Sequence, residues 1–209
     1  MIDAKVMLKA LCFAAGLGYA TSWVAAQEAA PEAEAPAGDA AVIEDPPEIL
    51  SADPAVLLEQ LAAEADPVEA GRLAREVLER WSHSGSDAMD LLLARGAAAV
   101  EAEDWPRAIA HLTALTDHAP EFAEGWAKRA EAFFRMGEYG AAMADLEQVL
   151  ILEPRHFEAL AGLGLILVEL GEEEAALRAF HRAQEIYPAE ENVAGAVERL
   201  EIQTGGRTL

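Results

Sequence analysis

Three prolines recur at a fixed interval of 34 residues, at Pro120, Pro154 and Pro188. Each proline closes a block in which apolar, small and turn residues keep the same order. A constant period of this length is typical of stacked copies of one small unit, because a single unit cannot bury its apolar face alone. The sequence therefore predicts three repeats, over residues 89–120, 123–154 and 157–188.

Each block has the residue spacing of two helices joined by a tight turn. Apolar and small residues lie three and four positions apart, which places them on one face of each helix. In the second block these positions, with the turn and the closing proline, are Trp126, Ala130, Phe133, Gly137, Tyr139, Ala142, Leu146, Val149 and Pro154. The small residues Gly96, Ala130 and Gly164 are expected to leave room where the partner helix crosses closely.

This order of residues resembles the signature of the tetratricopeptide repeat family. The resemblance covers residues 89–188 in three copies that are in register, although the block ending at Pro120 lacks the turn glycine. It implies an all-α fold, an α-α superhelical solenoid of helix-turn-helix repeats. It also implies a protein that binds other proteins or peptides and has no catalytic activity.

Two flanking segments extend the predicted helical domain to residues 53–209. Residues 53–86 contain two amphipathic stretches and are interpreted as a degenerate repeat or an N-terminal cap of the stack. Residues 190–203 carry apolar side chains at helical spacing and predict a final helix that covers the exposed edge of the last repeat.

The first 52 residues differ in composition from the rest of the chain. Two lysines precede an uncharged run that reaches Ala26, so residues 1–26 are interpreted as a signal peptide cleaved between Ala26 and Gln27. The alternative is an uncleaved membrane anchor. Residues 27–52 are rich in Ala, Pro and Glu and are predicted to form a disordered linker. These features favour a periplasmic or secreted protein, or, with the anchor retained, one on the inner membrane facing the periplasm.

The charge balance and the motifs exclude several classes of function. The formal net charge is −23, which would repel nucleic acid and anionic membrane surfaces. The five histidines form no metal-binding pair, and the sequence has neither a glycine-rich phosphate loop nor a nucleophile elbow. We therefore expect no enzymatic activity, no cofactor and no metal.

The family resemblance also implies a partner-binding surface. In this family the first helix of each repeat lines a concave groove, and peptide segments commonly lie in it. The corresponding positions are Leu93, Ala97, Glu101, Ala127, Glu131, Phe134, Arg135, Ala161, Leu165 and Val168. Glu101 and Glu131 could hold a basic residue. Phe134 is either a binding anchor or a core residue, because Phe133 beside it already fills the packing position.

Three functional hypotheses follow. The first is an exported, non-catalytic adaptor or scaffold in the cell envelope that binds a protein or peptide through the concave face. The second is an inner-membrane assembly or regulatory subunit in which residues 1–26 remain as an anchor. The third is an enzyme of unrecognised type, which would require a deep polar pocket with perturbed titratable side chains.

Overall fold

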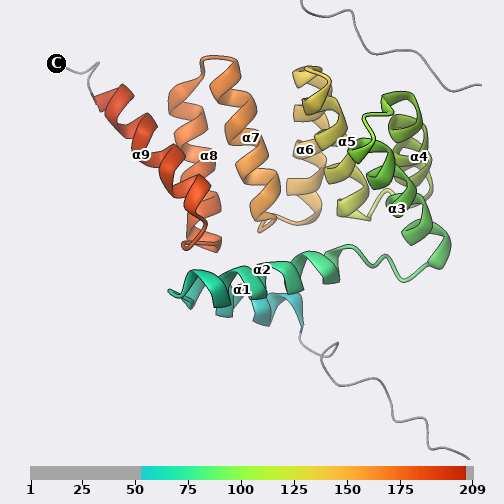
Figure 1. Ribbon diagram of the computed structural model, residues 1–209, viewed down its shortest axis with the longest axis horizontal. Helices are drawn as coiled ribbons and strands as arrows, with labels where there is room; N and C mark the ends of the chain where they lie inside the picture. Colours follow the sequence, from blue (N-terminus) through green and yellow to red (C-terminus); the bar gives the residue numbers. More distant parts are fainter. Residues whose placement is uncertain (1–52, 206–209) are drawn as a thin grey trace, which may run out of the picture. The chain divides into compact units, whose positions relative to one another are not determined.

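The computed structural model describes residues 53–205, which belong to one compact unit. The predicted signal peptide with its cleavage site at Ala26 and Gln27, and the predicted linker over residues 27–52, lie outside the described residues. The described part of the chain contains nine α-helices and no strand, which confirms the predicted all-α repeat fold (Figure 1). The helices are α1 (Pro54–Ala63), α2 (Pro67–Trp81), α3 (Asp87–Glu101), α4 (Trp105–His118), α5 (Ala123–Arg135), α6 (Tyr139–Leu152), α7 (Phe157–Glu169), α8 (Glu173–Ile186) and α9 (Glu191–Gly205).

The turn inside each repeat uses the same backbone conformation. Gly137 and Gly171 follow α5 and α7 with φ angles of 77° and 76°, in the left-handed region that glycine adopts without strain. The equivalent position of the first repeat, 34 residues earlier, is Glu103 with φ 55°. The first repeat therefore keeps the turn geometry although it lacks the turn glycine.

Glycine lets the two helices of a repeat cross closely. A methyl group added at Gly164 in α7 would lie 2.6 Å from a ring carbon of Phe180 in α8. Gly96 in α3 has the same relation to Leu112 in α4. Ala130 in α5 is almost fully buried. The expectation that Gly96 and Gly164 make room for the partner helix is therefore confirmed by these distances.

The pair α1–α2 packs against the last repeat instead of stacking on the first. Leu61, Leu73 and Val77 share one buried cluster with Phe157 in α7, Phe180 in α8 and residues of α9. Figure 1 shows the two helices running across the others, beside the ends of α7 and α8. Residues 53–86, predicted as a degenerate repeat or an N-terminal cap of the stack, thus form a helical hairpin that packs on the last repeat.

The turn after α2 is fixed by hydrogen bonds to the start of α3. The backbone N–H and the hydroxyl of Ser84 donate to Asp90 at 2.8 and 2.6 Å. Gly85 has a φ of 80°, which is easily accessible only to glycine. A turn of defined conformation therefore connects the hairpin to the first repeat.

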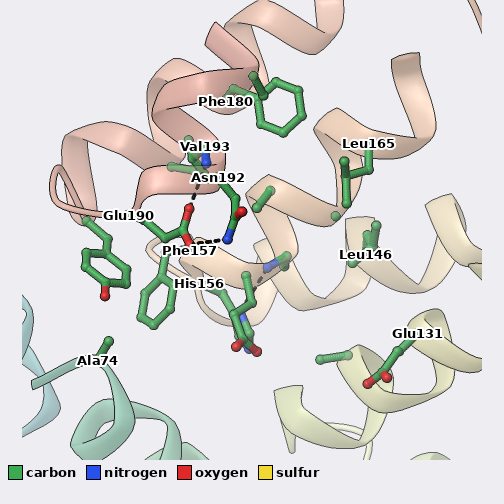
Figure 2. Close-up of a pocket in the computed structure, with 18 of the residues that line it drawn as sticks. Ala74, Glu131, Leu146, His156, Phe157, Leu165, Phe180, Glu190, Asn192 and Val193 are labelled. Carbon is green, nitrogen blue, oxygen red and sulfur yellow. Dashed lines mark hydrogen bonds between the residues drawn. The ribbon is translucent and has the colours of Figure 1, made fainter. Parts of the chain in front are cut away.

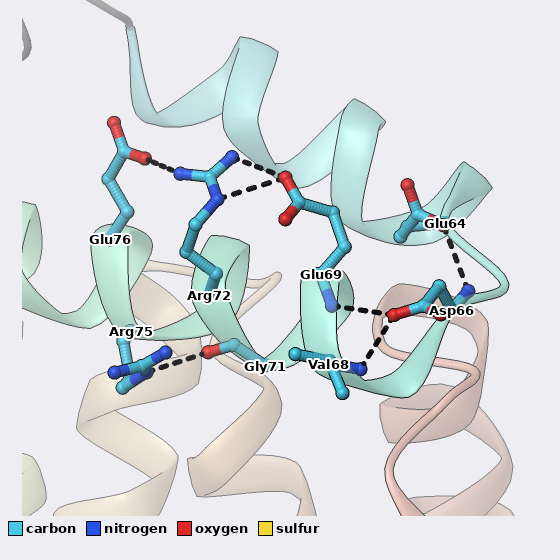
Figure 3. A network of polar contacts seen from close by, with 8 residues as sticks. All are labelled: Glu64, Asp66, Val68, Glu69, Gly71, Arg72, Arg75 and Glu76. Carbon is cyan, nitrogen blue, oxygen red and sulfur yellow. Dashed lines mark hydrogen bonds and ion pairs between the residues drawn. The ribbon is translucent and has the colours of Figure 1, made fainter.

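The outer face of α2 carries charged side chains. Arg72 donates to Glu69 at 2.7 Å and to Glu76 at 2.9 Å, and Asp66 accepts the backbone N–H groups of Val68 and Glu69 (Figure 3). These are contacts within one helix and its N-cap, and exposed pairs of this kind contribute little to stability. The apolar face of α2 therefore decides where the hairpin docks.

None of the helices over residues 53–205 has the length and apolar composition needed to cross a membrane.

Candidate functional site

A groove of about 970 Å³ runs between α2, α5, α7 and α9, with a few side chains of α6 and α8 at its floor. Helices α5 and α7 are the first helices of the second and third repeats, and α9 follows the last repeat. The groove therefore lies on the side of the stack that the first helices form. Helix α2, which comes from the N-terminal hairpin, provides a further wall through Gly71, Ala74, Arg75 and Leu78. Figure 2 shows Ala74 facing the groove from this wall, opposite His156 and Phe157.

The structure brings six of the ten predicted groove residues together. Those that line the groove are Ala127, Glu131, Phe134, Arg135, Ala161 and Leu165. Leu93 does not: it is buried in the apolar core of the first repeat with Val100 and Leu112. Ala97, Glu101 and Val168 also lie outside the lining. The groove therefore lies along the second and third repeats and α9, and α2 of the hairpin forms its further wall.

Phe134 is both a packing residue and a groove residue. It is half-buried, packs against the core of the second repeat and has its ring centroid 5.8 Å from that of Tyr139. Leu165 differs, because 48% of it is exposed and it contributes to no buried cluster. Leu165 is accordingly the apolar groove residue that can be changed with the least effect on the fold.

A cluster of charged side chains occupies the end of the groove near the start of α7. The buried Glu124 lies 3.4 Å from His156 Nε2 through one carboxylate oxygen and 3.9 Å from Lys128 Nζ through the other. Lys128 also donates to Glu131 at 3.3 Å. Glu158, in the first turn of α7, also lines the groove.

The electrostatics of this cluster are dominated by burial and by its surplus of carboxylates. Burial raises the pKa of the Glu158 carboxyl; Lys128 lowers it, and nearby Glu124 raises it further. Burial disfavours the charge on Lys128, but the carboxylates of Glu124, Glu131 and Glu158 outweigh it and raise the pKa of Lys128. Lys128 is therefore held as a cation. Glu158 itself is exposed to solvent, which screens the effect of its surroundings on its charge.

His156 joins the charged cluster to the hairpin. Its Nδ1 accepts the backbone N–H of Ala159 at 3.2 Å, so Nε2 carries the proton and points to Glu124. The indole of Trp81, at the end of α2, stacks on the imidazole with ring centroids 4.5 Å apart. Both nitrogens of the imidazole therefore have polar partners, and one face of the ring is covered by Trp81. His156 has a structural role in joining α7 to the hairpin.

Further contacts tie the hairpin to this end of the groove. Arg155 donates to Glu59 of α1 at 2.9 Å. Gly71 of α2 approaches so closely that a methyl group there would lie 3.6 Å from the Tyr187 hydroxyl. Both contacts join segments that are far apart in the sequence, and the repeat pattern alone could not indicate them.

One sequence signal does identify part of the cluster. Asp90, Glu124 and Glu158 recur at the 34-residue period, so each repeat carries a carboxylate at the same place in the first turn of its first helix. We did not single out these residues from the sequence. Residues at this position contact the preceding turn or the groove and do not lie at the helix crossing. Because they are charged, the apolar periodicity of the repeats does not reveal them.

Arg129 lies nearby but belongs to the interior of the second repeat. Its guanidinium makes two hydrogen bonds of 2.8 Å to Asp145 and one of 2.9 Å to Thr116, and it lies 4.9 Å from the centre of the Trp126 ring. The ion pair is mostly buried. Its role is to hold α5 to α6 and to α4.

The described residues offer no group of His, Cys, Asp and Glu side chains that could hold a metal ion. The charged cluster near His156 is held together by its own hydrogen bonds and ion pairs.

Comparison with known proteins agrees with the repeat architecture. The sequence model described as tetratricopeptide repeat matches residues 93–146 and 127–191. A TPR repeat-containing protein of Rhizobium etli is 39% identical over 153 residues, which is 73% of this chain and 75% of that protein. Among solved structures, MamA has a TM-score of 0.53 at 21% identity, over 71% of this chain and 84% of that one. The first TPR domain of Spaghetti, bound to an HSP90 peptide SRMEEVD, has a TM-score of 0.55 at 20% identity, over 57% of this chain and 95% of that one.

The two solved structures share the fold with this protein, and the Rhizobium relative shares both the repeat and most of the length. The residues that carry the repeat, from the small residues at the helix crossings to the left-handed turns, are in place in all three pairs. The chain therefore belongs to the tetratricopeptide repeat family.

Proposed function

We propose that this protein is a non-catalytic adaptor that holds a segment of a partner protein in the groove between α2, α5, α7 and α9. The observation that carries the proposal is the groove itself, which is open to solvent and is lined by exposed Leu165 and half-buried Phe134. A groove that combines an exposed leucine, a partly exposed aromatic ring and charged side chains has the composition of a protein-binding surface. The first TPR domain of Spaghetti, which is bound to an HSP90 peptide, is a precedent for a peptide ligand on this fold.

The enzyme hypothesis receives less support. The cluster around Glu124 and His156 is buried and charged, which meets part of the expectation for a catalytic site. However, both imidazole nitrogens already have partners and Trp81 covers the ring. A general base must be able to reach the proton that it abstracts, and this arrangement leaves His156 no free nitrogen.

Site-specific photocrosslinking in the native host tests the proposal. A photoreactive amino acid at Leu165 is expected to give adducts with one or a few proteins. The same amino acid at Ile202, which is 70% exposed near the end of α9, is the matched control and is expected to give none of them. The variant Leu165→Ala should lose the adduct formed from a second groove position, Ala161, while Ile202→Ala keeps it. Equal yields at the groove and control positions would refute the groove as the binding site.

We also propose that the adaptor works in the cell envelope, with residues 1–26 removed as a signal peptide. The support is the uncharged run that ends in small residues at Ala26, together with a mature chain that has no cysteine. Mass spectrometry of the purified protein from its host decides the matter. An N-terminus at Gln27 supports export and cleavage, whereas Met1 or Ile2 favours the alternative of a membrane-anchored subunit.

A further inference from the structure

The carboxylates that recur in the three repeats differ in how they are satisfied. Asp90 accepts two hydrogen bonds from Ser84, at 2.8 and 2.6 Å. Glu124 lies 3.4 Å from His156 and 3.9 Å from Lys128. The side chain of Glu158 is exposed to solvent and makes no hydrogen bond or ion pair within the described residues. It interacts with Lys128, Glu124, Glu131 and His156 only at longer range. The third repeat therefore has a groove-lining carboxylate whose equivalents in the other two repeats each have a close donor.

Glu158 lies near two further carboxylates and one ammonium group, while Arg75 and Arg199 line the groove from α2 and α9. Three carboxylates, from Glu124, Glu131 and Glu158, share the single ammonium group of Lys128. Arg135, the next cation along α5, is taken up by Glu131, at 3.8 Å, and by Glu101 and Glu103 of the first repeat. Since a like charge nearby disfavours ionisation and an opposite charge favours it, one additional cation at this end of the groove would be stabilised.

The face of α7 that borders the groove gives the spacing of the ligand. Glu158, Ala161, Gly162 and Leu165 all line the groove, and their spacing of three, four and seven residues places them in one row. Ala161 and Gly162, in the middle of this row, have small side chains or none and leave space in the groove between Glu158 and Leu165. Glu158 and Leu165 are separated by about 10 Å along the helix axis, from a rise of ~1.5 Å per residue.

We propose that the groove recognises a basic and apolar segment of the partner, in which a lysine or arginine side chain pairs with Glu158 and an apolar side chain contacts Leu165. In an extended segment, about three residues span this distance at ~3.3 Å each. The net charge of −23 on the whole chain attracts such a partner at long range, while Glu158 provides the specific contact. This inference rests on the proposed function, because it describes the ligand of the same groove.

Peptide selection on the full chain tests the inference. The probe is a phage-displayed library of random 12-residue peptides, selected at physiological ionic strength so that non-specific attraction is screened. The expected result is enrichment of Lys or Arg at one position and of an apolar residue about three positions away. Enrichment of acidic residues, which would indicate recognition by Lys128 and Arg135, overturns the inference, and so does the absence of any charge preference.

Variants then locate the contact. Affinity of the selected peptide should fall about 10-fold or more in Glu158→Gln, as expected for loss of a charge-assisted contact. The matched control is Glu185→Gln, an exposed position on α8 outside the groove lining, which should change affinity less than about 2-fold, since surface charges away from a contact contribute little. An equal loss in both variants would show that only general electrostatic attraction is at work and would refute the role of Glu158.

Two further measurements separate this inference from the proposed function. The variant Glu158→Lys should reject the selected peptide and bind its counterpart in which the basic residue is replaced by Glu; no such exchange would contradict the ion pair. If Leu165→Ala weakens binding of peptides that show no basic preference, the groove remains the site and only the inference fails. If Leu165→Ala leaves the affinity of every selected peptide unchanged, the groove is not the site and both proposals fail. Circular dichroism and thermal unfolding of each variant verify that the fold is retained.

Discussion

Two glycines of α7, only two residues apart, are expected to respond differently to the same substitution. In Gly162→Ala the new methyl group would lie 3.8 Å from Leu146, which is an ordinary van der Waals distance. In Gly164→Ala it would lie 2.6–2.8 Å from three atoms of the Phe180 ring, which is too close for any real contact. The helix and the chemical change are the same in both variants, so the difference between them isolates the crossing of α7 with α8.

The magnitudes follow from two opposing contributions. Replacing glycine by alanine inside a helix stabilises it by ~0.8–1.0 kcal/mol. Forcing a methyl group into a packed interior costs ~1–3 kcal/mol, because Phe180 is almost fully buried and its ring cannot move without displacing its neighbours. Gly162→Ala should therefore stabilise the domain by about 1 kcal/mol. Gly164→Ala should range from neutral to destabilising by about 2 kcal/mol.

Urea and thermal unfolding followed by circular dichroism measure the effect. For a domain of this size, 1 kcal/mol corresponds to roughly 2–4 °C in the melting temperature. The melting temperature of Gly162→Ala should thus rise by a few degrees, and that of Gly164→Ala should fall below it by roughly 2–12 °C. Combining Gly164→Ala with Phe180→Leu should recover part of the loss, since the smaller side chain leaves room for the methyl group. If the two single variants were stabilised equally, the conclusion that α7 and α8 cross closely at Gly164 would be refuted.

Three further changes probe the core, the buried ion pair and the groove. Ala142→Leu adds volume at a fully buried position and should destabilise the domain by ~1–3 kcal/mol in urea unfolding; a neutral result would contradict the repeat register. Arg129→Met leaves buried Asp145 without its ion-pair partner and should cost ~3–5 kcal/mol, whereas a loss below 1 kcal/mol would show that the pair is not desolvated. Glu158 has a pKa raised in the folded state, so its ionisation opposes folding as the pH rises above about 4.5. Because Glu158 is exposed to solvent, the effect should be small: Glu158→Gln should raise the melting temperature slightly at pH 7 but not at pH 4, and an equal change at both values would exclude this linkage.

The repeats were predictable because their information is local and recurs. Gly164 and its equivalent Gly96 appear at the interval that the closing prolines set, and each reports on a crossing within its own repeat. The turn at Glu103 shows the same principle, since it keeps the left-handed geometry that the period assigns to its position. The spacing of the apolar residues and the position of the turn were sufficient to predict the helix crossings and turns of the repeats.

The docking of the hairpin was not predictable from the same kind of information. The apolar stripe of α2, which includes Leu73 and Val77, would fit a preceding repeat stacked on α3 as well as a hairpin packed on the last repeat. The choice depends on contacts such as that of Trp81 with His156, which join residues far apart in the sequence. The groove was predicted in part for the same reason: its α5 and α7 walls follow from the repeat, whereas its α2 wall and the partners of Glu124 follow from tertiary packing.

The placement of α1 and α2 has a consequence for the order in which the protein is made. Glu59 and its partner Arg155 are 96 residues apart, so the first two helices leave the ribosome long before the surface that will cover their leucines exists. Two helices of 10 and 15 residues are too short to persist alone in water. They therefore cannot fold stably during synthesis until α7, α8 and α9 are complete. A chain truncated before α7 would leave their apolar side chains exposed and prone to aggregate.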